Sequence, residues 1–328
     1  MKEEDIRKRE TFDKYLQLVE QDIDTFFVNR SSFEIINCPA CKSPEFKEEF
    51  EKLGFKYVSC KKCNTLFVNP RPSFEALKRF YVQSPSTQFW VNGFFKPVAE
   101  ARREKLFKPR ADFIREKFGD DPAWLIGDIG AGFGIFLEEL RKIWPDSEYV
   151  AIEPSLEMAE ICRQKSFIVQ NLPAEEVSDY RGQFDLLIAF ELFEHLFDPG
   201  IFLERIGSLL KPGGYLLLTT LNGQGFDIQL LWENSKSISP PHHLNFFNPK
   251  SISLLLASCG FIKAEVTTPG KLDWDIVEGM IKSSKMDLGR FWEFVAYSKN
   301  EICKSELQEW IGRNDLSSHM RVIAKKND

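Results

Sequence analysis

The stretch Ala123-Trp-Leu-Ile-Gly-Asp-Ile-Gly-Ala-Gly-Phe-Gly-Ile-Phe136 decides the fold of this chain. Its first part is a short apolar run that predicts a buried strand, and residues 135–144 place apolar side chains at helical spacing. Three glycines at alternate positions separate the two, and glycine lets the backbone turn tightly and approach a ligand closely. Because the free amides of the first helical turn face the same place, this unit predicts a site for a nucleotide-like ligand.

The order of residues in the turn narrows the class of ligand. A dinucleotide-binding turn requires G-x-G-x-x-G, but the sixth position counted from Gly130 is Ile135, and the Gly-Lys-Ser/Thr of a phosphate-binding loop is absent. The run instead reads Asp128-x-Gly130-x-Gly132-x-Gly134. The carboxylate would repel a pyrophosphate, whereas it suits a ligand that carries a cationic amino group. The plain alternative is a turn that only closes the strand–helix unit.

This acid-x-Gly-x-Gly-x-Gly run resembles the first motif of the class I S-adenosylmethionine-dependent methyltransferases. A second expected strand, 149–153, ends in Glu153, nineteen residues beyond Gly134, where an acid can accept hydrogen bonds from two ribose hydroxyls. The resemblance implies that Asp128, the three glycines and Glu153 bind S-adenosylmethionine. It also implies a place for the adenine ring after the third and fourth strands, with the candidate residues Leu172, Ala174 and Phe190.

Strand and helix patterns alternate through the rest of the chain. We expect a helix at 98–118, and after the second strand further strands at 167–170, 184–190, 209–220, 261–267 and 321–324. Another helix is expected at 250–260, and two helical segments precede the last strand. This order predicts an α/β fold with a Rossmann-like, doubly wound seven-stranded sheet of the methyltransferase type.

Two C-x-x-C pairs lie upstream, Cys38 with Cys41 and, after eighteen further residues, Cys60 with Cys63. This spacing indicates a four-thiolate zinc site. Four thiolates complete the tetrahedron and leave no open position, so the predicted role of the zinc is structural. Expected strands at 45–51 and 55–59 give a small zinc ribbon at about 36–68.

The N-terminal region is expected to form a module of its own at 1–98, followed by the methyltransferase domain at 99–328. Residues 4–27 predict an amphipathic helix whose apolar stripe packs on the next module or on a second subunit of a homodimer. The linker after the ribbon carries Tyr81, Ser84 and Ser86. It is either a simple connector or a lid over the cofactor, and the sequence leaves both open.

Composition argues against several partners. The chain has a formal net charge of −6 and an isoelectric point of about 5.5, and this acidic balance does not indicate binding to nucleic acid or to an anionic membrane. No apolar run reaches the roughly 18 residues that a membrane span needs, and the first residues do not form a signal peptide. We therefore expect a cytoplasmic protein with a small-molecule substrate.

Three of the four histidines map to the rim expected to carry the cofactor. His195 follows the fourth strand, and His242 and His243 lie in a long loop, 221–248, after the fifth. Loops at the carboxyl ends of parallel strands form the ligand crevice in such folds. A histidine there predicts a general base, with His195 and His243 preferred and Tyr81 next. His242 would point the other way in an extended segment.

The combination of a four-cysteine module with this domain resembles the bacterial zinc-ribbon methyltransferases that include the C-methyltransferases of nucleotide-linked deoxysugars. This resemblance implies that Tyr81, His195 and His243 line the acceptor pocket. The chain departs from that group in carrying His242 where the group has glutamate, and in lacking its extra C-terminal domain. We therefore expect O-methylation of a sugar or nucleotide-linked sugar. The alternatives are C-methylation of such a sugar, an RNA methyltransferase that grips nucleic acid with its ribbon, and a non-enzymatic binding module.

Overall fold

The computed structural model describes residues 2–120, 122–284 and 286–327. The chain divides into two compact units, each assembled from separated segments. The first, unit 1, consists of Met1–Lys96, Thr220–Ile252 and Thr267–Arg321, and unit 2 consists of Pro97–Thr219, Ser253–Val266 and Val322–Asp328. The expected boundary at 98/99 stays a prediction, since both units recruit segments from the second half of the chain.

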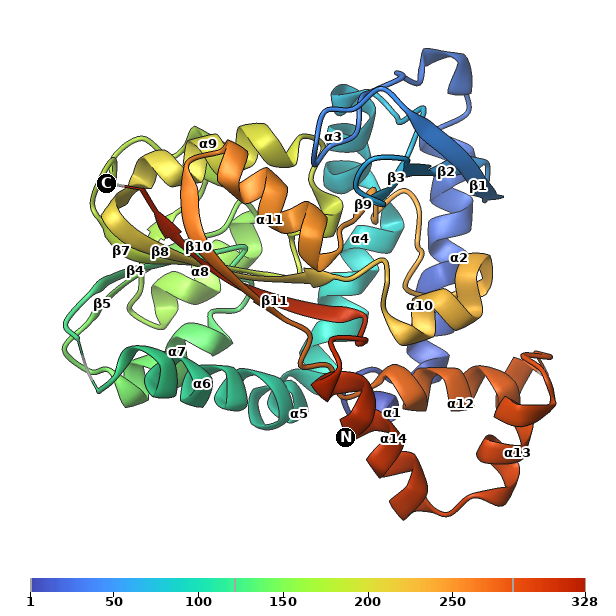
Figure 1. The fold of residues 1–328 in the computed structure, drawn as a ribbon. Helices are drawn as coiled ribbons and strands as arrows, with labels where there is room; N and C mark the ends of the chain where they lie inside the picture. The colour runs from blue at the N-terminus through green and yellow to red at the C-terminus, as the bar shows by residue number, and fades with distance from the viewer. Residues whose placement is uncertain (1, 121, 285, 328) are drawn as a thin grey trace. The chain divides into compact units, whose positions relative to one another are not determined.

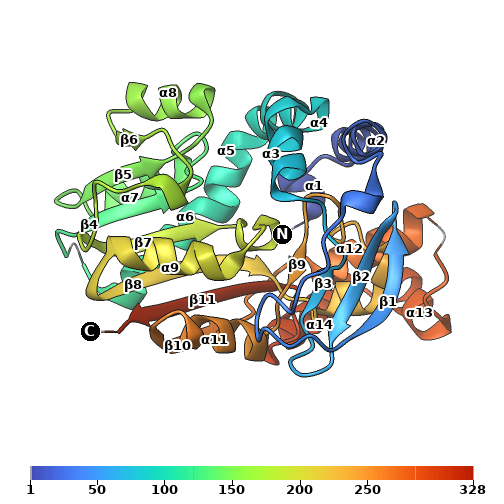
Figure 2. The ribbon, with the colours of Figure 1, turned by 90° about the horizontal axis from the view of Figure 1, so that it is seen from above.

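A seven-stranded sheet with the order β10-β11-β8-β7-β4-β5-β6 confirms the predicted α/β, Rossmann-like doubly wound fold (Figures 1 and 2). The strands are β4 Leu125–Ile129, β5 Glu148–Ile152, β6 Ile168–Gln170, β7 Phe184–Phe190, β8 Leu210–Leu221, β10 Phe261–Thr267 and β11 His319–Lys326. Central strand β4 runs parallel to both neighbours, with Gly127 opposite Val150 of β5 and Leu187 of β7. Because the strand order reverses beside β4, the crevice that binds ligands in such sheets is expected at its carboxyl end.

Helices cover both faces of this sheet. Helix α7 (Ile135–Ile143) and helix α6 (Lys108–Phe118) lie on one face and α9 (Pro199–Leu209) on the other (Figure 1). Helix α8 (Leu156–Gln164) follows β5, and the side chain of Ser155 caps it by accepting from the amide of Met158. The core between helices and sheet is apolar, with Ile114, Phe136, Leu137, Leu140, Trp144, Ile126, Leu186 and Ile188 all buried.

The helix predicted at 98–118 is present without a break from Ala99 to Phe118, but it is not α-helical throughout. Helix α5 (Ala99–Arg102) passes through a wider π-helical turn, Arg103–Phe107, before α6 begins. The Arg103 guanidinium at the start of that turn pairs with Glu138 at 2.8 Å and Glu139 at 2.6 Å, both on α7. Gly119 ends α6 with φ +91°, a conformation that side-chain-bearing residues rarely adopt.

Unit 1 contains the predicted ribbon, but its sheet has a strand that the sequence did not predict. Strands β1 (Phe46–Lys52), β2 (Phe55–Cys60) and β3 (Leu66–Val68) form an antiparallel meander. Strand β9 (Asn245–Phe246) then pairs with β3 and completes the order β1-β2-β3-β9 (Figure 1). The long loop expected at 221–248 therefore contains a strand, and it also contains α10 (Phe226–Leu231) and the 3-10 turn Trp232–Asn234.

The remaining helices of unit 1 lie in its N-terminal and C-terminal segments. The single helix predicted at 4–27 is divided into α1 (Glu3–Ile6) and α2 (Arg9–Phe26), and its apolar stripe is buried within the chain itself. Helices α3 (Phe74–Gln83) and α4 (Pro85–Phe89) follow the ribbon, and the π-helical turn Trp90–Phe95 comes next. Between β10 and β11, the described residues form three helices where two helical segments were predicted: α12 (Asp273–Ser284), α13 (Arg290–Ser298) and α14 (Glu301–Arg313). The side chain of Asn300 caps α14 and so separates it from α13. Helix α11 spans Pro249–Ser258.

Candidate active site

The glycine turn between β4 and α7 has the conformation that its sequence requires. Gly130, Gly132 and Gly134 have φ of +72°, +56° and +67°, in the left-handed region where a Cβ is strained. Gly134 is also crowded, since a Cβ there would lie 3.1 Å from the sulfur of Cys162. The three glycines thus adopt the positive-φ turn that their sequence predicted, and the binding of a ligand there stays a prediction.

Glu153 lies directly beside this turn at the end of β5. One carboxylate oxygen accepts from the amide of Gly132 at 2.8 Å, and the other from the amide of Ser155 at 2.9 Å. Burial raises the pKa of Glu153, while these two amides lower it. Each oxygen keeps a further lone pair, so the carboxylate can still accept from two hydroxyls of a ribose.

Asp128 is the second acid of the turn and is only 4% exposed. It has no hydrogen bond or ion pair within the part of the chain that the structure describes. Burial raises the pKa of Asp128 to about 8, the negative charge of Glu153 adds to this effect, and Arg110 opposes it. A buried carboxylate without a partner is costly, so a cationic ligand group would stabilise its ionised form.

The sequence analysis missed two charged residues near the carboxyl ends of the central strands, Arg110 and Glu191. Arg110 on α6 donates to Glu191 at 2.7 Å, and its guanidinium lies 4.5 Å from the centre of the Phe190 ring. Glu191 follows β7, has φ +51°, and also accepts from the hydroxyl of Thr219 at 2.8 Å. An acid directly after a strand was a usable signal for Glu191, as it was for Glu153. Arg110 had no local signal, because its role depends on where α6 packs.

The residues expected near adenine lie after two different strands of unit 2. Leu172 follows β6 and is 39% exposed, and the buried Ala174 begins the 3-10 turn Ala174–Glu176. Phe190 ends β7, where its ring meets that of Phe136 at 4.9 Å. The side-chain amide of Asn171, the residue after β6, donates to the carbonyl of Glu153 at 2.8 Å and so connects the ends of β5 and β6.

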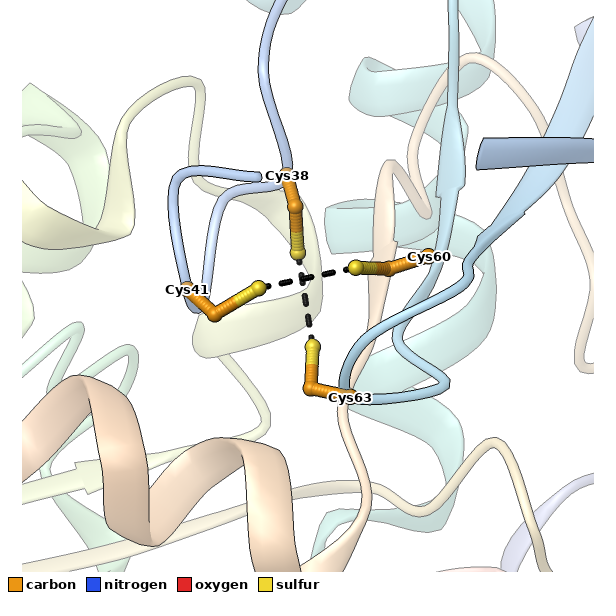
Figure 3. Close-up of side chains that lie close together, drawn as sticks. All are labelled: Cys38, Cys41, Cys60 and Cys63. Atoms are coloured by element: carbon orange, nitrogen blue, oxygen red, sulfur yellow. Dashed lines mark hydrogen bonds between the residues drawn. The ribbon is translucent and has the colours of Figure 1, made fainter. Parts of the chain in front are cut away.

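The four cysteines of the ribbon converge, as Figure 3 shows. Their sulfur atoms all lie within 4.8 Å of one another, with 3.5 Å between Cys38 and Cys63 and 3.5 Å between Cys41 and Cys60. A tetrahedron of Zn–S bonds of about 2.3 Å has sulfur–sulfur edges of roughly 3.8 Å. The four side chains therefore fit a tetrahedral thiolate metal site.

The histidine candidates belong to different units. His195 ends the 3-10 turn Phe193–His195 in unit 2. His242, His243 and Tyr81 belong to unit 1, where residues 240–242 form a turn and not the expected extended segment. The His242 ring is 6% exposed and packs on Phe80 at 4.8 Å and on Tyr81 at 5.6 Å.

His243 has a ring that is oriented by the backbone. Its Nδ1 lies 2.5 Å from the carbonyl oxygen of Ser237. A carbonyl can only accept, so Nδ1 carries the proton of the neutral ring and the lone pair is on Nε2. This tautomer is the one that a general base acting through Nε2 requires.

The fold and the glycine turn define an α/β methyltransferase architecture, and comparison with known families agrees. Residues 98–266 match the family model described as "Methyltransferase domain". The chain belongs to this family, and these residues form a class I S-adenosylmethionine-dependent methyltransferase domain.

Similar proteins include ubiquinone biosynthesis O-methyltransferases. That of Bradyrhizobium diazoefficiens is 33% identical over 100 residues, which are 29% of this chain and 39% of the relative. That of Rhodopseudomonas palustris (strain BisA53) is 32% identical over 172 residues, covering 47% and 65%. The chain thus spans between four-tenths and two-thirds of the length of these relatives. Among solved structures, a SAM-dependent methyltransferase from Archaeoglobus fulgidus is similar with a TM-score of 0.47 and 22% identity, covering 68% of this chain and 94% of the other.

No helix among residues 2–120, 122–284 and 286–327 is both long and apolar enough to cross a membrane.

Proposed function

We propose that this protein transfers the methyl group of S-adenosylmethionine to a hydroxyl oxygen of a small polar acceptor, a sugar or nucleotide-linked sugar. The observation that carries the choice of oxygen is the 2.5 Å contact between Nδ1 of His243 and the carbonyl oxygen of Ser237, since a neutral ring that donates there has Nε2 as its acceptor, which suits a hydroxyl proton. The O-methyltransferase names of the relatives support the same atom. A cytoplasmic location is part of this proposal.

The cofactor would be held by the two acids and the glycines of the turn. Glu153 would accept from the ribose hydroxyls, and Asp128 would face the ammonium group of the methionine end. Arg110 lies close enough to act electrostatically on Asp128, so it would take the carboxylate of that same amino-acid group. Leu172, Ala174 and Phe190 would flank the adenine ring. The cofactor supplies an activated methyl group, and the protein orients the acceptor and removes its proton.

The four-cysteine cluster would bind one zinc ion with a structural role. Four thiolates leave no coordination position for substrate or water, so the ion would act through folding. Replacing Cys60 by Ser is expected to lower the zinc content below one ion per chain and to lower the melting temperature. A Cys60→Ser protein that keeps both would contradict this assignment.

The decisive test is methyl transfer from labelled S-adenosylmethionine to a panel of nucleotide sugars. His243→Ala and His195→Ala are each expected to lower turnover by roughly 10²-fold or more and to keep cofactor affinity within a few-fold. His319→Gln is the control for loss of an imidazole elsewhere. Wild-type turnover in both variants would exclude these histidines as the base and leave Tyr81. NMR of the product separates transfer to oxygen from transfer to carbon.

A further inference from the structure

The segment that carries His242 and His243 is built into the ribbon sheet. Strand β9 follows these histidines directly, and it pairs with β3 so that Phe246 lies opposite Leu66. One residue earlier, the carbonyl of Leu244 accepts from the amide of Val68 at 2.9 Å. The segment is therefore held by the ribbon immediately after the second histidine.

The contact nearest to the imidazole comes from Tyr57 in the middle of β2. Its hydroxyl donates to the carbonyl oxygen of His243 at 3.0 Å. The Tyr57 ring is fully buried, stacked on Phe50 with 5.1 Å between centroids and meeting Phe246 at 6.1 Å. Burial raises the pKa of Tyr57 well above its ordinary value, so the hydroxyl stays a neutral donor at every working pH.

The imidazole is thus held from two directions. On the ring side, Nδ1 donates to the carbonyl of Ser237, and on the main-chain side Tyr57 fixes the carbonyl of the same residue. The amide of His243 also donates to the carbonyl of Ser239 at 2.9 Å, which closes the turn between them. With its backbone and one ring nitrogen fixed, the direction of Nε2 is set before any substrate binds.

Two of the four cysteines connect the metal cluster to the segment that carries His243, one through strand β2 and one through a hydrogen bond to Asn248. Cys60 is the last residue of β2, three positions after Tyr57, and the carbonyl of Cys63 accepts from the side-chain amide of Asn248 at 2.9 Å. Arg71, which follows β3, donates to the side chain of Asn245 on β9 at 3.1 Å. Residues 244–248, which follow the two histidines, are therefore held by β3, Arg71 and Cys63 of the ribbon.

We propose that the ribbon is a positioning element for the His243 imidazole, in which Tyr57 sets the direction of that ring within unit 1. The inference rests on the proposed role of His243 as the base. Tyr57 touches no reacting atom and acts only through His243. The cofactor residues belong to unit 2, so loss of the Tyr57 contact is expected to leave cofactor binding unchanged.

The test compares Tyr57→Phe with Ser59→Ala, a change on the same strand. The hydroxyl of Ser59 donates to Glu49, and among the described residues it makes no hydrogen bond to residues 237–248, so Ser59→Ala is a matched loss of one hydroxyl. The chain has four histidines, so imidazole resonances of a ¹⁵N-labelled protein can be assigned with single His→Gln variants. Tyr57→Phe is expected to shift the His243 resonances alone and to lower kcat about fivefold, with zinc content and S-adenosylmethionine affinity unchanged. Ser59→Ala should leave all four quantities as in the wild type.

Unchanged His243 resonances in a folded Tyr57→Phe protein would overturn the inference, and so would an unchanged kcat when His243→Ala is inactive. Full turnover in His243→Ala would instead refute the proposed base, which makes the two failures distinguishable. If Tyr57→Phe does not fold, Asn248→Asp serves in its place. That variant keeps the acceptor that caps Ser251 at 2.9 Å but loses the donor to Cys63, and it is expected to shift the same resonances.

Discussion

Each unit of this protein buries a pair of carboxylates, and the two pairs look alike until their surroundings are compared. In unit 2, Glu153 is satisfied by two backbone amides, whereas Asp128 has no partner within the described chain. In unit 1, Asp273 is satisfied by donors from Ser317, Ser318 and Gln308. Asp227, fully buried at the start of α10, has neither carboxylate oxygen in a hydrogen bond.

The surroundings assign the two unpartnered acids to different roles. Asp128 lies beside a turn of positive-φ glycines and feels the positive charge of Arg110, so a cationic ligand can replace its missing partner. Burial raises the pKa of Asp227 to about 7, and the negative charge of Asp273 adds to this effect. A proton is the simplest way to remove that charge. A buried acid without a partner therefore indicates a ligand site only under two conditions. A turn such as that of the three glycines must let a ligand approach, and a nearby charge, here that of Arg110, must complement the ligand.

The largest effect is expected from Asp227→Asn. The folded-state pKa lies above the unfolded value, so the native state binds an extra proton between about pH 4 and pH 7. The stability that this carboxyl contributes is full below pH 4 and is lost as the pH rises through 7. Asparagine is neutral at every pH, so the variant should be more stable than the wild type at pH 8, by up to about 4 kcal/mol, and no more stable at pH 4.

Urea unfolding of Asp227→Asn and wild type at a series of pH values measures this difference. Equal stabilisation at all pH values would show that the acid is not protonated in the folded state. A rise in wild-type melting temperature with added Mg²⁺ or Ca²⁺, absent in Asp227→Asn, would assign the pair to a cation and would contradict the protonation of Asp227.

A slightly smaller effect is expected at the other pair. Glu153→Ala removes the acceptor for two ribose hydroxyls and should weaken S-adenosylmethionine binding by about 2–3 kcal/mol, because hydrogen bonds to a charged group are lost. Isothermal titration calorimetry measures the affinity. Glu148→Ala, an exposed acid at the first position of the same strand, is the control. Unchanged affinity in Glu153→Ala would contradict the assignment of the ribose hydroxyls to this carboxylate.

The smallest effect is a pH dependence of cofactor affinity. If Asp128 must ionise to face an ammonium group, the affinity should rise with pH and level off above about 8, by at most about tenfold per pH unit below that value. Asp128→Asn should bind more weakly at pH 8 and show a flatter profile. A profile that is equally steep in the variant would assign the titrating group elsewhere.

The sequence predicted best where chemistry and backbone conformation coincide within a few residues. The glycine turn, Glu153 after β5 and the converging cysteines were all visible as local patterns. What the sequence missed lies where long-range contacts decide. The helix expected at 98–118 is present, but its π-helical turn at Arg103–Phe107, where Arg103 pairs with acids on α7, does not show in the periodicity. Arg110 could not be found for the same reason, since nothing near it in sequence marks the acid it contacts.

What the sequence determined by itself is the class of fold and the cofactor chemistry, because a tight glycine turn and four thiolates at fixed spacing each admit few structures. What only the tertiary structure decided is how the acceptor side is organised. Two residues at 245 and 246 are too short a strand to predict, and they pair with β3 only because the ribbon offers an unpaired edge. That pairing, together with the hydroxyl of Tyr57, joins His243 to a module almost two hundred residues earlier in the chain. The local sequence of either segment does not identify its partner, since strand pairing depends on the tertiary context in which each strand packs.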